Sequence, residues 1–294
     1  MRFFNNKLSR INFLILVGIL TYLYSNMSNS DGYVSAISKA SPSVINISSK
    51  KNIDTKLFDG RPANGLIGSG IIISNDGYII TNLHVIENAR VIDVELDDGQ
   101  VYPATLIGFD ERSDLAVIKI TPMNDLSPIA LSNSSSVQIG DQVIAIGNAF
   151  GLGKTFTSGI ISATGRDYGN PYLELIQTDA AINSGNSGGA LIDIDGNLIG
   201  INTMIQSTTG GFMGYGLAIP INSAKTIIER IQKFGNKRNY LGVTISDISK
   251  SDRSSYGKSL PKDAGVLINQ VVSNSPAHKV GILPGDVIIK VNKV

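Results

Sequence analysis

The 294-residue chain contains no cysteine, no tryptophan and only two histidines, His84 and His278. The absence of cysteine excludes disulfide frameworks, thiolate zinc sites, iron–sulfur clusters and thiol nucleophiles. Charged residues are also scarce, at 17%, and the net charge is +1, so the chain carries no overall basic field that would attract nucleic acid. The sequence therefore predicts a protein with no metal site, no cofactor and no nucleic-acid partner, with a length that suits one large domain or two ordinary ones.

Glycine, by contrast, is abundant, and its 31 residues are dispersed among short runs rich in isoleucine and valine. Turn sequences such as Asp-Gly separate many of these runs between Ser43 and Pro220. This spacing favours β-barrels or sandwiches over an alternating α/β sheet. Apolar residues then recur at helical spacing over Ile221–Phe234, which predicts a helix. The polar stretch after it predicts a boundary between a first domain at 31–235 and a second at 236–294.

The N-terminal segment, residues 1–30, has the pattern of an export signal. Three basic residues precede an apolar run from Ile11 to Tyr24, and this charge asymmetry places the rest of the chain outside the cytoplasm. The run is shorter than the roughly 20 residues that comfortably span a bilayer, which favours a cleavable signal. However, only Ser28 and Ser30 offer a small-x-small cleavage site. We expect an uncleaved anchor, with a soluble protein after signal cleavage as the alternative.

Candidate catalytic residues begin with Ser187, which lies in the segment NSGNSGG at 183–189. A serine between glycines can occupy a sharp, exposed turn surrounded by backbone N–H groups, as a serine nucleophile and its oxyanion hole require. The alternative is an ordinary Ser/Gly turn. His84 follows an apolar strand directly, whereas His278 lies in a polar context in the second domain. If a histidine activates the serine, the pattern therefore favours His84.

A carboxylate that orients the imidazole completes such a site. Asp97 and Asp98 are better explained as turn residues, and Asp93 alternates with apolar neighbours along a strand. Asp114 immediately precedes a strongly apolar strand, where an acid can lie beside a cleft. On local chemistry alone, Asp110 remains a competitor.

Three motifs, Asn82-Leu83-His84-Val85, Ser113-Asp114-Leu115-Ala116-Val117 and Gly185-Asn186-Ser187-Gly188-Gly189, resemble those of the HtrA family of serine proteases. The order His, Asp, Ser is also that of chymotrypsin-like enzymes. The resemblance covers about Ser35 to Val294. It implies a mostly β chain, with a chymotrypsin-like pair of six-stranded barrels followed by a PDZ domain.

The resemblance also implies roles for individual residues. His84 is the general base, Asp114 its orienting acid and Ser187 the nucleophile, and the amides of Gly185 and Ser187 form the oxyanion hole. Ile201, Asn202 and Thr203 line the specificity pocket, which suits a small aliphatic side chain before the scissile bond. Phe150, Arg166 and Gln177 lie near a switch that reorders loops around the site.

The second domain carries Tyr240-Leu241-Gly242-Val243, which resembles the carboxylate-binding loop of a PDZ domain. Family PDZ domains of this arrangement continue past Val294 with the helix that walls the peptide groove. We therefore expect a C-terminally incomplete PDZ domain.

The resemblance is nearest to the membrane-anchored, DegS-like members. It implies a homotrimeric serine endopeptidase of the periplasm, tied to the inner membrane, that acts on unfolded or regulatory polypeptides in quality control or envelope-stress signalling. C-terminal peptides of misfolded proteins are then candidate PDZ ligands. Two alternatives are a catalytically silent peptide-sensing scaffold and a constitutively active protease with a non-functional PDZ domain.

Overall fold

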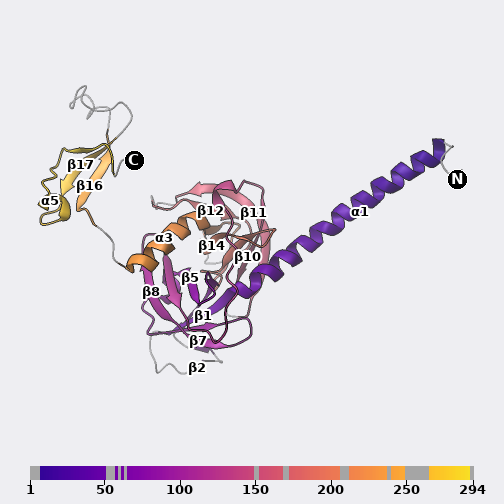
Figure 1. Ribbon diagram of the computed structural model, residues 1–294, viewed down its shortest axis with the longest axis horizontal. Helices are drawn as coiled ribbons and strands as arrows, with labels where there is room; N and C mark the ends of the chain where they lie inside the picture. The colour runs from indigo at the N-terminus through magenta and orange to yellow at the C-terminus, as the bar shows by residue number, and fades with distance from the viewer. Residues whose placement is uncertain are drawn as a thin grey trace. The chain divides into compact units, whose positions relative to one another are not determined.

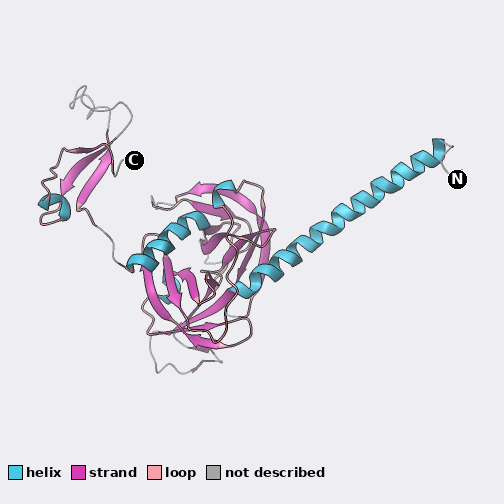
Figure 2. Cartoon of the chain, viewed as in Figure 1, coloured by secondary structure: helices cyan, strands magenta, loops and turns pink. Residues whose placement is uncertain are grey.

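The computed structural model describes residues 7–50, 57–58, 61–62, 65–148, 152–167, 172–205, 212–236, 240–248 and 265–291. The chain divides into two compact units, Met1–Asn236 and Lys237–Val294. Strands dominate both units (Figure 2), so the mostly β fold predicted from the sequence is confirmed.

The first half of unit 1 is an antiparallel sheet of seven strands in the order β7-β6-β1-β4-β5-β9-β8. Strands β1, β5, β7 and β8 of this sheet are labelled in Figure 1. Its strands are β1 (Val44–Lys50), β4 (Gly65–Ile72), β5 (Tyr78–Asn82), β6 (Val91–Glu95), β7 (Val101–Pro103), β8 (Thr105–Asp110) and β9 (Leu115–Lys119), with a separate hairpin of β2 (Leu57–Phe58) and β3 (Arg61–Pro62). Among the described residues the edge strands β7 and β8 do not pair, so this half of the predicted double β-barrel is a half-barrel rather than a closed one. The β7 edge is short and ends at Pro103, which has no N–H to donate.

The second half of unit 1 is a closed barrel of six antiparallel strands, as expected. Around the barrel the order is β10-β11-β12-β15-β14-β13. The strands are β10 (Gln142–Gly147), β11 (Thr155–Arg166), β12 (Leu175–Thr178), β13 (Ala190–Asp193), β14 (Leu198–Ile205) and β15 (Gly216–Pro220).

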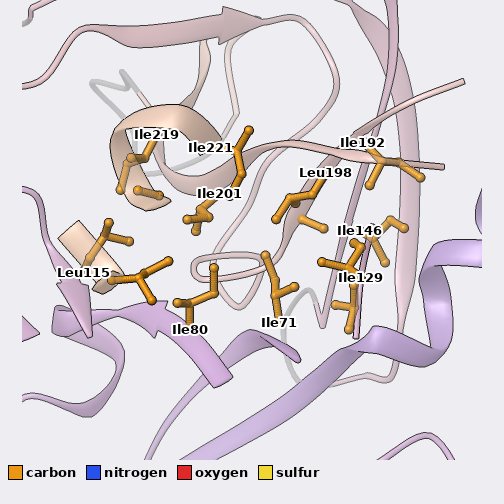
Figure 3. Packing of buried hydrophobic residues seen from close by; sticks show 14 of the residues in the cluster. Ile71, Ile80, Leu115, Ile129, Ile146, Ile192, Leu198, Ile201, Ile219 and Ile221 are labelled. Carbon is orange, nitrogen blue, oxygen red and sulfur yellow. The ribbon is translucent and has the colours of Figure 1, made fainter. Parts of the chain in front are cut away.

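A shared hydrophobic core joins these two halves (Figure 3). Ile80 and Leu115 from the first sheet and Ile201 and Ile219 from the barrel are all fully buried in it. Ile221, the first residue of helix α3 (Ile221–Phe234), also belongs to this core. The helix predicted over these residues is confirmed, and it ends where Gly235 adopts a positive φ of 61°. Because the two halves share one apolar cluster, side chains at their junction are held in fixed positions.

Helix α1 (Lys7–Ala40) continues past residue 30 without a break and leads through the 3₁₀ helix η1 (Ser41–Ser43) into β1. Its last turns pack on the barrel, since Ala36 and Ala40 are buried. Lys39 Nζ donates to Asp195 O at 2.8 Å and to Asn197 Oδ1 at 2.9 Å. Within the described part of the chain, no helix has the length and apolar character that crossing a membrane requires.

Unit 2 contains a three-stranded sheet, β16-β17-β18, and a short helix. The elements are β16 (Val243–Asp247), β17 (Val266–Val271), helix α5 (Pro276–Lys279) and β18 (Val287–Ile288). Gly242 has a φ of 82°, and a Cβ at this position would lie 2.1 Å from the Cβ of Ser275. Only glycine therefore fits where the chain enters β16.

Candidate active site

His84 and Asp114 lie side by side just beyond the paired ends of β5 and β9 in the first sheet. His84 is in the short helix α2 (Leu83–Ile86) that follows β5, and Asp114 directly precedes β9. His84 Nδ1 is 2.6 Å from Asp114 Oδ2, and the His84 backbone N–H donates to Asp114 Oδ1 at 3.0 Å. Both carboxylate oxygens of Asp114 thus contact His84. The imidazole remains accessible, with 47% of the His84 side chain exposed, so its other ring nitrogen can face a substrate.

Asp114 has an unusual backbone, with a positive φ of 54° that costs energy for a residue with a Cβ. Two donors hold its carbonyl oxygen: Leu83 N at 2.9 Å and Asn82 Nδ2 at 2.9 Å. The hydroxyl of Thr203, on β14 of the barrel, donates to Asp114 Oδ2 at 3.3 Å. Asn82 Nδ2 also lies 3.3 Å from Thr203 Oγ1, and both side chains are buried. The orientation of Asp114 is therefore fixed from both halves of unit 1.

Asp110, the competing carboxylate, has different partners. Its Oδ1 accepts the backbone N–H groups of Arg112 at 2.9 Å and Ser113 at 3.3 Å. Its Oδ2 forms an ion pair with Arg230 of helix α3. Asp110 thus stabilises the turn before Asp114 and attaches α3 to the sheet, while Asp114 alone of the two contacts the imidazole.

Ser187 lies on a turn between β12 and β13 in the barrel half, flanked by two glycines with positive φ, Gly185 at 98° and Gly188 at 81°. Its hydroxyl donates to the carbonyl oxygen of Thr203 at 3.1 Å. Within the described residues, it makes no hydrogen bond to the His84 ring. Thr203 therefore contacts both predicted partners of the base, Asp114 through its hydroxyl and Ser187 through its carbonyl.

The predicted oxyanion-hole amides belong to Gly185 and Ser187. Among the described residues, neither N–H donates to another protein group. Two carbonyl oxygens of the same turn, those of Gly185 and Ser187, accept hydrogen bonds from Ser69 on β4. No role for Ser69 was predicted from the sequence, and Asn82 entered only as part of the motif that contains His84. The only sequence signal for Ser69 is a serine between two glycines inside an apolar strand.

The three predicted pocket residues occupy different surroundings. Ile201 is fully buried in the core between the two halves. The side-chain amide of Asn202 donates to Ala190 O at 2.9 Å, which attaches β14 to β13. Only Thr203 contacts the residues predicted to be catalytic.

The predicted switch residues are only partly described. Phe150 lies outside the described residues. Arg166 is exposed at the end of β11, and Gln177 is buried in β12. Gln177 Oε1 has no hydrogen-bond partner within the described chain. Among the described residues, neither Arg166 nor Gln177 forms a hydrogen bond or an ion pair with the predicted triad.

The predicted carboxylate loop belongs to unit 2. Tyr240 and Leu241 are exposed by 58% and 45%, Gly242 follows, and Val243 begins β16. His278 is exposed in helix α5 of the same unit. Among the described residues of the whole chain, no three His, Asp or Glu side chains could together hold a metal ion.

Comparison with protein families identifies two regions of the chain. Residues 68–201 match a trypsin-like peptidase domain, and residues 230–294 match a PDZ domain. The first match contains all three predicted triad residues, and the second contains the predicted carboxylate loop.

Curated relatives carry the same type of name. "Periplasmic serine endoprotease DegP" of Escherichia coli is 47% identical over 232 residues, which cover 77% of this chain and 48% of the relative. A "Probable periplasmic serine endoprotease DegP-like" of a Marinomonas species is 38% identical over 308 residues, covering 93% of this chain and 65% of the relative. The chain thus spans between about half and two thirds of the length of these relatives.

Solved structures agree with this match. The HtrA-type protease AlgW with a decapeptide has a TM-score of 0.75 and 40% identity, over 89% of this chain and 86% of that one. The serine endoprotease from Yersinia pestis has a TM-score of 0.67 and 37% identity, over 89% of this chain and 82% of that one. The chain belongs to the HtrA-type family of serine proteases, in which a trypsin-like peptidase domain precedes a PDZ domain.

Proposed function

We propose that this chain is a periplasmic serine endopeptidase that cleaves unfolded or regulatory polypeptides through an acyl-enzyme. The observation that best supports the proposal is the position of Thr203, whose hydroxyl donates to Asp114 and whose carbonyl accepts the Ser187 hydroxyl. One residue thus joins the nucleophile to the acid that holds His84. The names of the relatives support the same reaction and the same compartment.

In the proposed mechanism, Asp114 accepts a hydrogen bond from the N–H of His84 Nδ1. This keeps the proton of the neutral imidazole on Nδ1, so Nε2 carries a lone pair and can act as a base. The Ser187 hydroxyl turns from the Thr203 carbonyl to His84 Nε2, transfers its proton there and attacks the carbonyl carbon of the peptide bond. The Gly185 and Ser187 amides stabilise the negative oxygen that forms. The tetrahedral intermediate collapses as His84 donates the proton to the leaving amine, and an ester on Ser187 remains. Water, deprotonated by His84, then hydrolyses this ester.

The position of the Ser187 hydroxyl bears on the two alternatives, a catalytically silent scaffold and a constitutively active protease. Because the hydroxyl donates to Thr203, attack requires a change of rotamer, so the described arrangement corresponds to a resting state. A catalytically silent scaffold would remain in this state under all conditions. A constitutively active protease would leave it without any added peptide.

The test is reaction with a peptidyl phosphonate, which labels a serine only when a neighbouring base activates it. Wild type and Ser184→Ala should be labelled and should digest unfolded casein, whereas Ser187→Ala should do neither. Ser184 is an exposed serine of the same loop, so it is a matched control. Labelling is measured with and without peptides that end in a free carboxylate. An unlabelled wild type under both conditions would leave the silent scaffold as the function.

The remaining features come from the resemblance and are proposed on that basis. We expect a homotrimer in the periplasm, anchored to the inner membrane by its N-terminal segment, with roles in quality control or stress signalling. AlgW has been solved with bound peptides. We therefore propose that the loop Tyr240–Val243 of this chain binds the C-termini of misfolded proteins. Membrane fractionation and the mass of the detergent-solubilised particle test the anchor and the trimer.

A further inference from the structure

Ser69 on β4 makes four hydrogen bonds at the junction of the two halves, and it is fully buried. Its backbone N–H donates to Ser187 O at 2.9 Å, and its hydroxyl donates to Gly185 O at 2.8 Å. The same hydroxyl accepts from the backbone N–H of Asn148 at 2.8 Å, and the carbonyl accepts from Thr81 Oγ1 at 2.7 Å. One serine of the first sheet therefore binds the carbonyl groups of Gly185 and Ser187, which belong to the nucleophile turn, the turn between β12 and β13 of the barrel that carries Ser187.

These two contacts restrain the peptide that carries the Ser187 amide. In a trans peptide the carbonyl and the following N–H point in opposite directions. With the Gly185 carbonyl held by Ser69, the Asn186 N–H points away and donates to Asn183 O at 3.0 Å. With the Ser187 carbonyl held in the same way, the Gly188 N–H donates to Asn202 O at 2.8 Å. The peptide between Asn186 and Ser187 thus lies between two anchored peptides, so its N–H cannot rotate freely.

The Ser69 hydroxyl also connects this turn to the loop that follows β10. A hydroxyl has one proton to donate and lone pairs to accept, so it can serve Gly185 and Asn148 together. The Asn148 side chain in turn accepts a hydrogen bond from Gly153 N at 2.8 Å. A Cβ on Gly147, the last residue of β10, would lie 2.7 Å from Asn186 Cα, so the end of β10 packs directly against the turn that carries Ser187.

We propose that the Ser69 hydroxyl is a positioning residue that fixes the oxyanion hole for the transition state. The inference rests on the proposed function, because it assigns the hole to the Gly185 and Ser187 amides. Ser69 touches no substrate and no reacting atom. It acts by holding the Gly185 carbonyl, and alanine at position 69 removes this contact and the contact to Asn148 while its backbone N–H still reaches Ser187 O.

The test compares Ser69→Ala with Ser43→Ala in the full chain. Ser43 is also buried, and its hydroxyl donates to Ser127 O at 2.8 Å, outside the site. Removing a donor from an oxyanion hole lowers kcat by about 10²–10³. Ser69→Ala leaves both amides in place but less firmly held, so we expect a smaller fall in kcat, by about 10- to 100-fold, with KM unchanged. Ser43→Ala should lower thermal stability but leave kcat intact. Ser69→Thr, which keeps the hydroxyl, should restore kcat to near the wild-type value.

A peptidyl boronate with a small aliphatic side chain supplies the second readout, because its tetrahedral oxygen occupies the oxyanion hole. Its Ki should rise in Ser69→Ala by the same factor by which kcat/KM falls. If Ser69→Ala does not fold, Ser69→Cys keeps the volume with a far weaker donor and should show the same losses. A kcat and a boronate Ki that match those of Ser43→Ala would overturn the inference. A wild type that neither cleaves casein nor binds the boronate would instead refute the proposed function, and the inference would fall with it.

Discussion

Asp110→Asn and Asp114→Asn should have opposite effects, because the two aspartates have different partners. The first should lower stability and leave catalysis intact, and the second should abolish catalysis and leave stability intact. In Asp110→Asn, the new amide oxygen can still accept the Arg112 and Ser113 N–H groups, but the ion pair with Arg230 is lost. Breaking a buried ion pair costs roughly 3–5 kcal/mol. The Arg230 side chain is 29% exposed and that of Asp110 is 8% exposed, so water compensates part of the loss and we expect about 2 kcal/mol. For a unit of this size, that lowers Tm by about 4–8 °C.

Asp114→Asn should behave in the opposite way. Asparagine tolerates the left-handed backbone that Asp114 adopts, with its φ of 54°, so Tm should change by no more than about 2 °C. The new amide group would favour the wrong tautomer of His84, and kcat should fall by about 10⁴. Activity is then lost without loss of structure.

The assay is thermal unfolding followed by circular dichroism, together with kcat on a fluorogenic peptide, for wild type and both variants. Asp110→Asn should melt early but retain kcat at 20 °C, whereas Asp114→Asn should melt with wild type but be inactive. An inactive Asp110→Asn with normal Tm, beside an active Asp114→Asn, would refute the assignment of the acid.

Three further changes test other parts of the structure. Gly188→Ala should lower kcat more than 100-fold with circular dichroism retained, because a Cβ there would lie 2.2 Å from Ser69 O; wild-type activity would contradict this geometry. Lys119 and neighbouring donors hold the pKa of Asp76 below its ordinary value of 3.8. This stabilisation is complete well above that pH and is lost as the pH falls through the lower, folded-state value, so the Tm difference between wild type and Asp76→Asn should shrink from pH 6 to pH 3. Gly242→Ala should unfold unit 2 alone, visible by calorimetry as the loss of one transition while the peptidase transition stays.

Local sequence patterns were sufficient to predict the type of most elements. Alternating apolar residues and Asp-Gly turns predicted the strands, and the spacing of apolar residues predicted helix α3 with its bounds. The open first sheet was not predictable in this way. Its order places β1 between β4 and β6 and β5 beside β9, and these pairings depend on packing between segments far apart in the chain.

For the site as well, local sequence motifs predicted some residues, and the contacts between distant segments were needed to identify the others. Local chemistry could not choose between Asp110 and Asp114, because both precede β9 and only the fold shows that one faces Arg230 and the other His84. The role of Ser69 was not predictable because the partners of its hydroxyl, Gly185 and Asn148, lie more than 70 positions away along the chain. The predicted pocket residues have different surroundings for two reasons. Strand alternation turns Asn202 away from the face that carries Ile201, and the pairing of β14 with β15 has a register irregularity between Asn202 and Met204, at Thr203.

The junction between the two halves also has a consequence for the order of assembly. The proposed base His84 and its acid Asp114 come from the first half, while the proposed nucleophile Ser187 and Thr203 belong to the barrel. A chain that has folded only one half holds either a base without a nucleophile or a nucleophile without a base. Under the proposed mechanism, we therefore expect a chain with only one folded half to be inactive, and cleavage to require the shared core between the two halves.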